Sequence, residues 1–154
     1  MAEKLYFEDL YPGQRFSTQS ALVTESEIKE FAKRFDPQPF HLDDDDARTT
    51  LFGGLAASGW HTAAITMRLN VTSGPSIAGG IIGSSGEINW PTPTRPGDVL
   101  HVESEIVEVT PSRSHPERGM ILLRSETVNQ DGKVVQLSKM KLVVFRRDVP
   151  SNVR

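Results

Sequence analysis

The sequence predicts an α+β domain in which helices come first and an antiparallel sheet follows. Two observations lead to this prediction. Between residues 24 and 71, helix signals alternate with turns rich in glycine and proline, and from residue 81 onwards four strand-like segments follow one another. The last two segments flank Gln130-Asp131-Gly132, which is a strong hairpin signal. A chain of 154 residues is long enough for one domain with a real core, so we expect a single domain over residues 1–154.

Composition limits the classes of protein that the chain can represent. Hydrophobic residues make up 37% and charged residues 24%, which is typical of a folded domain. The formal net charge of -3 offers no basic excess for nucleic acid. The chain has no cysteine, which excludes disulfides, thiolate metal ligands and a cysteine nucleophile. Because the first ten residues lack an apolar signal segment and no apolar run reaches membrane-spanning length, we expect a cytoplasmic protein without membrane contact.

The first half of the chain contains the helix signals. Residues 15–23 read as a loose strand, and Thr24 to Glu27 form a capping box that opens a helix to about Arg34, with Ile28, Phe31 and Ala32 on its buried face. The four acids at residues 43–46 suit the first turn of a short helix. Gly59 opens a further helix, from residue 60 to about 71, which is apolar around much of its circumference and therefore predicts a central, buried helix. Strands are expected at 81–90, 99–109, 120–129 and 133–146.

The stretch Phe35-Asp36-Pro37-Gln38-Pro39-Phe40-His41 holds a close acid/base pair. Its two prolines argue against a regular helix, so we expect Asp36 and His41 on a stiff turn. An aspartate that accepts a hydrogen bond from one imidazole nitrogen would fix the tautomer and leave the other nitrogen free to take a proton. An N–H near Gly59, at a helix N-terminus, is a donor for a carbonyl oxygen that gains charge. An isolated Asp-x4-His spacing is also common in ordinary helix-ending turns.

Several motifs together resemble the MaoC-type dehydratases, the group that includes the (R)-specific enoyl-CoA hydratases. That family carries an aromatic residue, then Gly-Asp-x-Asn-Pro-aliphatic-His, five further residues and a small residue. The matching positions in this chain are Phe31, Asp36, Pro39, His41 and Ala47. The run Ala57-Ser58-Gly59 matches the small-residue-Gly pair that opens the family's central helix, and the turn from Pro93 to Asp98 matches its Pro-x-x-x-Pro-Gly-Asp turn.

The resemblance covers nearly the whole chain and implies a hotdog fold, with a long central helix wrapped by a curved antiparallel sheet of about five strands. It implies reversible hydration of trans-2-enoyl-CoA to (R)-3-hydroxyacyl-CoA, with Asp36 and His41 acting on one water and the Gly59 N–H binding the thioester oxygen. Gln38 would orient the water or His41. Coenzyme A enters only as part of the substrate, and neither a metal nor another cofactor is implied.

This chain departs from the family pattern beside the acid/base pair. Gln38 replaces the family's Asn, Phe35 its Gly, and Phe40 a smaller aliphatic residue. These changes leave the pair intact and alter the shape of the pocket. The candidates for an acyl pocket are Phe35, Phe40, Phe52, Trp60 and His61; for the last two, packing in the core or at an interface is an equal alternative.

Two other functions are compatible with the same fold. The first is an acyl-CoA thioesterase, which would use a carboxylate and water without a paired histidine. The second is a non-catalytic protein that binds acyl thioesters, with bulky Phe35 or Phe40 filling the pocket. Cations in predicted turns, namely Arg95, Arg113, His115 and Arg118, are expected to be solvated rather than to bind the phosphates of coenzyme A. An exposed edge strand favours a homodimer or a higher homo-oligomer.

Overall fold

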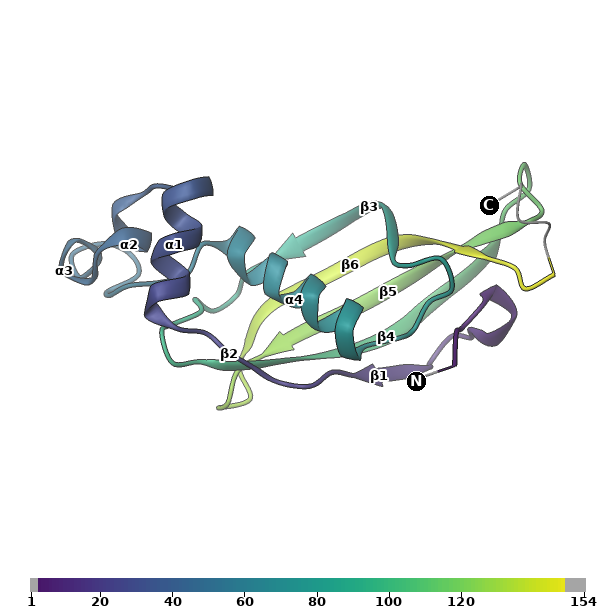
Figure 1. The fold of residues 1–154 in the computed structure, drawn as a ribbon, viewed down its shortest axis with the longest axis horizontal. Coiled ribbons are helices and arrows are strands. Elements are labelled where there is room, and N and C mark those ends of the chain that lie inside the picture. Colours follow the sequence, from purple (N-terminus) through teal and green to yellow (C-terminus); the bar gives the residue numbers. More distant parts are fainter. Residues whose placement is uncertain (1–2, 149–154) are drawn as a thin grey trace.

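The computed structural model describes residues 3–148, so the ends of the expected domain, residues 1–2 and 149–154, lie outside the described residues. One antiparallel sheet forms the body of the molecule, and helix α4 (Gly59–Ser73) lies across one face of it (Figure 1). The three shorter α-helices gather at one end of the sheet. The predicted α+β architecture is therefore confirmed.

The sheet has six strands, in the order β1-β4-β5-β6-β3, with β2 paired to β4 beside that path. The strands are β1 (Arg15–Ser17), β2 (Ala21–Leu22), β3 (Ile82–Asn89), β4 (Val99–Pro111), β5 (Arg118–Val128) and β6 (Val134–Phe145). Every strand pair is antiparallel. The four long strands agree with the prediction. The sheet has six strands rather than about five because residues 15–23 form two short strands that both pair with β4.

Helix α1 (Glu25–Phe35) begins where the capping box predicts. The Thr24 hydroxyl accepts a hydrogen bond from the Glu27 N–H at 3.1 Å, and the Glu27 carboxylate accepts from that hydroxyl rather than from the Thr24 backbone. Ile28 and Ala32 are buried as expected, whereas Phe31 is half-buried.

The prediction of a non-helical turn over residues 35–41 is wrong in its second half. The segment Pro39–Leu42 forms the single-turn helix α2, with Pro39 at its first position. Proline is tolerated there because the first N–H groups of a helix have no intrahelical acceptor. Helix α3 (Asp44–Ala47) follows, and the Asp43 side chain caps it by accepting from the Asp46 N–H, so the acidic run is the helix start that the sequence predicts.

Helix α4 is buried on one face only, which corrects the expectation of a fully buried central helix. Ile65 and Leu69 face the sheet. Trp60, Met67 and Val71 lie on the outside and are 60%, 48% and 62% exposed. Its apolar circumference therefore reflects a second apolar surface that this chain alone leaves uncovered.

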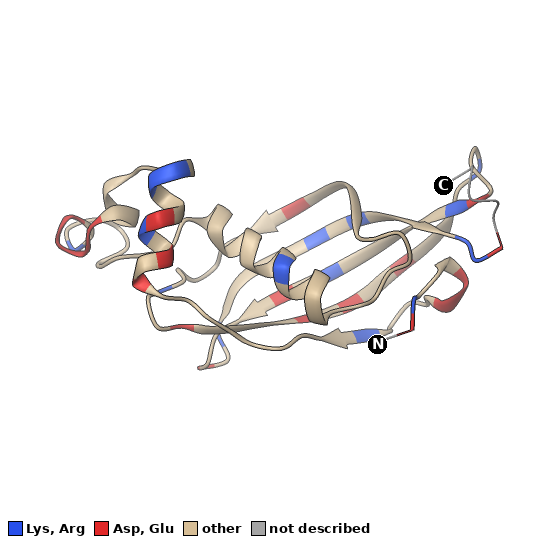
Figure 2. Ribbon diagram, in the orientation of Figure 1, with Lys and Arg blue, Asp and Glu red and all other residues tan. Residues whose placement is uncertain are grey.

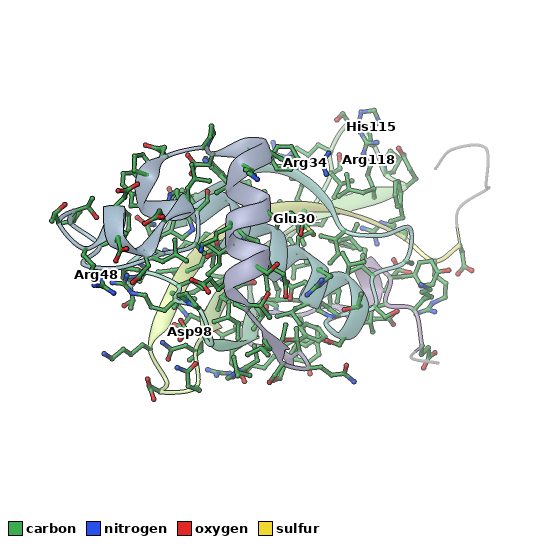
Figure 3. The ribbon with its side chains drawn as sticks, turned by 60° about the vertical axis from the view of Figure 1, so that its left-hand side comes forward. Glu30, Arg34, Arg48, Asp98, His115 and Arg118 are labelled. Atoms are coloured by element: carbon green, nitrogen blue, oxygen red, sulfur yellow. The ribbon has the colours of Figure 1, made fainter. Side chains whose placement is uncertain are left out.

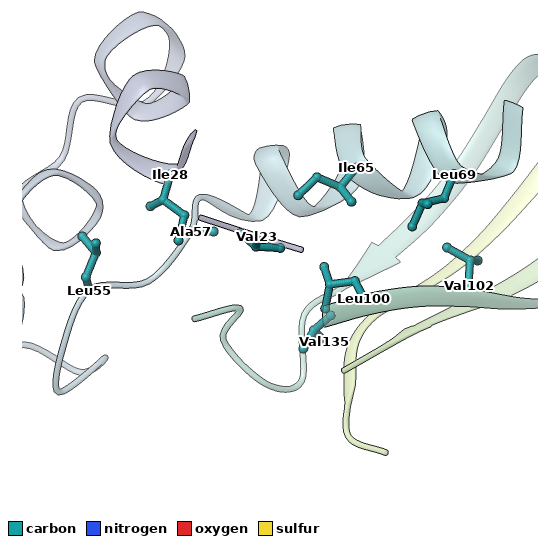
Figure 4. Packing of buried hydrophobic residues seen from close by; sticks show 9 residues of the cluster. All are labelled: Val23, Ile28, Leu55, Ala57, Ile65, Leu69, Leu100, Val102 and Val135. Atoms are coloured by element: carbon teal, nitrogen blue, oxygen red, sulfur yellow. The ribbon is translucent and has the colours of Figure 1, made fainter. Parts of the chain in front are cut away.

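The main hydrophobic cluster joins the helical end of the molecule to the sheet (Figure 4). Ile28 of α1 and Leu55 pack with Ile65 of α4 and with Leu100 and Val102 of β4. Burying one such side chain contributes roughly 1.5–3 kcal/mol. This cluster therefore fixes α1, and the residues that follow it, against the first turns of α4.

Charged residues of both signs lie along α1 and β5, whereas the longer helix α4 carries a single charge, Arg68 (Figure 2). Among residues 3–148, no helix is both long and apolar enough to cross a membrane.

Candidate active site

The His41 side chain is buried on α2, and both of its ring nitrogens have neighbours. Its Nδ1 lies 2.6 Å from the carbonyl oxygen of Ala56. A carbonyl can only accept, so Nδ1 carries the proton and donates it to Ala56. Its Nε2 lies 3.3 Å from Oδ2 of Asp36. The expected division of roles is therefore corrected: Ala56 rather than Asp36 fixes the tautomer, and the nitrogen left free to take a proton is the one that faces Asp36.

Asp36 ends helix α1, where its backbone N–H donates to the Ala32 carbonyl. Its Oδ1 accepts a hydrogen bond from Gln38 Nε2 at 2.6 Å, so Gln38 orients the carboxylate rather than His41. Partial burial raises the pKa of Asp36, but hydrogen bonds from Ser58 and Gln38 outweigh it, with a smaller contribution from the neighbouring His41, and the pKa falls below its ordinary value of 3.8. The carboxylate is therefore ionised at neutral pH.

Gly59 is the first residue of α4, so its N–H has no intrahelical acceptor. The preceding Ser58 is fully buried; its hydroxyl caps the helix by accepting from the Trp60 N–H and also contacts the Asp36 carboxylate. The indole of Trp90 packs directly against Gly59, because a Cβ at this position would lie 2.7 Å from Cε2 of that ring. Glycine is thus required here by the close approach of an aromatic side chain.

His41 and Gly59 line the same pocket, which has a volume of about 500 Å³. Phe52, Thr62 and Trp90 form other parts of its wall. The N-terminus of α4 and one member of the acid/base pair, His41, therefore meet at one cavity, whereas Asp36 lies behind His41 and is not among the residues that line it. The wall is mainly apolar, which suits an acyl group.

Of the five residues predicted for an acyl pocket, only Phe52 lines this one. Phe35 is 64% exposed and stacks under the Arg34 guanidinium, so it does not fill the cavity. Phe40 packs behind the site, with its ring edge-on to His41 at a centroid distance of 4.6 Å. Trp60 lies on the outer side of α4.

The fifth of these residues, His61, is buried between α1 and α4 rather than in the pocket. Its ring stacks on Phe31 at 4.7 Å with an interplanar angle of 7°. Burial lowers the pKa of His61, with a smaller contribution of the same sign from Arg68, and Glu27 opposes the change. Nδ1 of His61 has no hydrogen-bond partner. The residue therefore acts as a neutral aromatic packing group.

Sequence reasoning missed the residues that hold the loop before the Ala56 carbonyl. The Arg95 guanidinium donates to the carbonyl oxygens of Gly54, Leu55 and Phe52. The Asp44 carboxylate accepts from the Leu55 N–H at 3.0 Å. The Pro-Gly-Asp turn could have indicated this role. Arg95 comes directly before the turn, and the Asp98 carboxylate accepts a hydrogen bond from the Arg95 backbone N–H at 2.8 Å. The prediction that Arg95 is a solvated cation is therefore wrong, because its guanidinium holds this loop.

The other candidate cations lie away from the pocket. The loop with Arg113 and His115, and Arg118 at the start of β5, are at the end of the sheet opposite the short helices, as the labels for His115, Arg118 and Arg48 show (Figures 1 and 3). His115 pairs with Glu117 at 3.5 Å. Among residues 3–148, no group of three or more His, Asp or Glu side chains is arranged to hold a metal ion.

The model of the MaoC-like domain matches residues 9–127. The chain belongs to the MaoC-like family. The crystal structure of the MaoC-like dehydratase from Rhodospirillum rubrum is 59% identical, covers 94% of this chain and 99% of its own, and superposes with a TM-score of 0.92.

Two further relatives carry names that state an activity. An (R)-specific enoyl-CoA hydratase from Rhodospirillum rubrum is 32% identical over 84% of this chain and 85% of its own. The R-hydratase PhaJ1 from Pseudomonas aeruginosa is 26% identical over 94% of this chain and 88% of its own, with a TM-score of 0.73. The fold is therefore the hotdog fold that the motifs predicted, and membership of this family supports a hydratase or dehydratase activity.

Proposed function

We propose that the protein catalyses the reversible hydration of a trans-2-enoyl-CoA to an (R)-3-hydroxyacyl-CoA. The observation that supports this most directly is the 3.3 Å approach of His41 Nε2 to Asp36 Oδ2 at a pocket that Gly59 also lines. One water on the pocket side can hydrogen-bond to both groups at once, because the two atoms are neighbours. The names of the relatives are consistent with this substrate class.

In the proposed mechanism, His41 Nε2 is the base. The Nδ1–H bond to Ala56 leaves the lone pair on Nε2, and the ionised Asp36 stabilises the imidazolium that forms. The water oxygen bonds to C3 of the substrate as its proton passes to the pair. The pair then returns a proton to C2, so that one water is added across the double bond and both side chains regain their initial state. Charge that develops on the thioester oxygen is stabilised by the Gly59 N–H.

An open pocket favours catalysis over a purely structural role. The bulky residues that distinguish this chain from the family pattern, Phe35 and Phe40, are not part of the pocket wall, and about 500 Å³ remains free. The carboxylate and histidine are paired, which a thioesterase would not require. These features favour a hydratase over a thioesterase and over a non-catalytic binding protein, and the activity assay distinguishes the three.

The test is the absorbance of the enoyl-thioester band after crotonyl-CoA or a longer 2-enoyl-CoA is added, with thiol release followed in parallel. Asp36→Asn and His41→Gln should each lower turnover by roughly a hundred- to ten-thousandfold. Asp45→Asn and His101→Gln are matched controls at the surface and should retain activity. Thiol release by the wild-type protein would indicate a thioesterase. A folded Asp36→Asn protein with near-normal hydration would rule the mechanism out.

We also propose that two copies form a homodimer through α4 and β3. Strand β3 is at the edge of the sheet, and its residues 82–87 are all exposed with a single charge, Glu87. Met67 and Val71 extend this surface on α4. Light scattering should give twice the chain mass for the wild-type protein and the chain mass for Val71→Glu. A monomeric wild-type protein at micromolar concentration would contradict the proposal.

A further inference from the structure

A second cavity lies between α4 and the sheet, under β3, β5 and β6. Its volume is about 160 Å³. Met67, Leu123, Met140 and Leu142 give it an apolar wall. Unlike an ordinary gap in a hydrophobic core, it also has polar side chains from both the helix and the sheet.

One of these polar side chains, Asn70, has a buried oxygen that accepts no hydrogen bond. Asn70 is only 8% exposed, and its Oδ1 is buried without a hydrogen-bond partner. A buried polar atom without a partner destabilises the protein, so a ligand that donates to it gains affinity. Other polar groups of the wall have partners: Thr66 bonds to Thr127 at 2.6 Å, and Ser125 bonds to Ser104 at 2.8 Å. The Asn70 carboxamide is therefore an acceptor held ready inside the cavity.

The cavity continues the direction of the active-site pocket along α4. Thr62 lines the pocket, and Thr66 and Asn70, four and eight residues later, line the cavity on the same face of the helix. At 1.5 Å of rise per residue, the cavity begins about 6 Å beyond Thr62 and reaches Asn70 at about 12 Å. On the opposite wall, Trp90 of the pocket donates to Gln136 of the cavity at 3.0 Å. One hydrogen-bonded pair thus joins the wall of the pocket to the wall of the cavity.

The lining also restricts the charge of an occupant. None of the residues that form the cavity is Lys, Arg, Asp, Glu or His. A carboxylate or an ammonium group beside Asn70 would lose water without gaining a counter-charge, which is unfavourable. A neutral hydroxyl has no such penalty, and it can donate to Asn70 Oδ1 and accept from Ser138 on the facing strand.

We propose that this cavity receives the distal end of the acyl chain and that Asn70 selects substrates whose tail carries a neutral hydroxyl group. The assignment rests on the proposed enoyl-CoA hydration for its link to catalysis. The expected substrates are hydroxylated acyl thioesters of medium length, rather than plain alkyl or dicarboxylic ones.

The experiment measures binding without turnover, by isothermal titration of hexanoyl-CoA and ω-hydroxyhexanoyl-CoA, and of the octanoyl pair, to the full chain. One additional buried hydrogen bond predicts about tenfold tighter binding of the hydroxylated member of the better pair. The Asn70→Leu variant keeps the branching at Cγ but has no hydrogen-bonding group, and it should lose this preference. Met140→Leu changes the apolar wall without altering a hydrogen-bonding group and should keep it.

Three results would overturn the inference. They are equal binding of the two members by the wild-type protein, an unchanged preference in a folded Asn70→Leu protein, or a preference for the plain acyl chain. Because the saturated ligands are not hydrated, this test does not depend on the proposed reaction. Failure of hydration with a preserved hydroxyl preference would reject the proposed function alone. Hydration with no hydroxyl preference would reject the inference alone.

Discussion

Gly59→Ala is the substitution whose effect can be worked out most fully from the structure. The new methyl group would lie 2.7 Å from Cε2, 2.8 Å from Cδ2 and 2.9 Å from Cζ2 of the Trp90 ring. An ordinary contact begins at 3.4 Å, so the ring and the first turn of α4 must separate by about 0.7 Å or more. The shift moves the Gly59 N–H, the proposed thioester donor, away from its position.

Two costs follow from this separation. Moving the indole strains or breaks the 3.0 Å bond from Trp90 to Gln136, which lowers the free energy of unfolding by about 0.5–1.5 kcal/mol. Displacing one donor to a developing oxyanion lowers the rate by roughly a hundred- to a thousandfold. Because the second effect is much larger, we expect a protein that folds well and hydrates enoyl-CoA poorly.

The assay is a double-mutant cycle in enoyl-CoA hydration, with Trp90→Leu as the second change. If the clash is the cause, removal of the ring relieves it, and Gly59→Ala/Trp90→Leu should be within about threefold of Trp90→Leu alone, a strongly non-additive result. Additive losses in a folded double variant would refute the reasoning, because the methyl group would then act without the ring. Full activity of Gly59→Ala would refute the role of this N–H.

Three further predictions follow. Ser58→Ala should lower the free energy of unfolding by about 0.5–2 kcal/mol, because a helix cap is lost. Since the change also removes a hydrogen-bond donor to Asp36, it should raise the pKa of that carboxylate and move the acid limb of the pH–rate profile to higher pH. An unmoved limb would contradict this. Arg95→Met should lower the urea midpoint and reduce hydration, because the loop before Ala56 loses its carbonyl contacts, whereas Arg34→Met on the exposed face of α1 (Figure 3) should do neither. His61 has a lowered pKa, so its contribution to stability is present above about pH 6.5 and is lost as the pH falls. In denaturation curves between pH 7 and 5, His61→Phe should therefore lose less stability than the wild type. An identical dependence of stability on pH in the two proteins would count against a buried neutral histidine.

The elements that sequence predicted best are those specified by local chemistry. The capping box at Thr24, the acidic start of α3, the opening of α4 at Gly59 and the Gln130-Asp131-Gly132 hairpin all appear where expected. Each depends on side chains within a few residues of one another. Helix α2 was not predicted, because Pro39 reads as a residue that interrupts helices. A helix of one turn has too few residues to show a helical pattern that would indicate the opposite.

By itself, the sequence determined the fold class and the family and pointed to Asp36 and His41 as the proposed acid/base pair, because motif spacing and periodicity are local properties of the chain. The tertiary structure decided what lies around that pair. The Ala56 carbonyl, which sets the tautomer of His41, is 15 residues away from it, and Arg95, which steadies the same loop, is 40 or more residues from the carbonyls that it holds. Only the packing of α4 on the sheet brings Asn70 into a cavity and leaves Phe35 outside the pocket. Such contacts depend on how distant segments pack together, and no pattern within one segment encodes them.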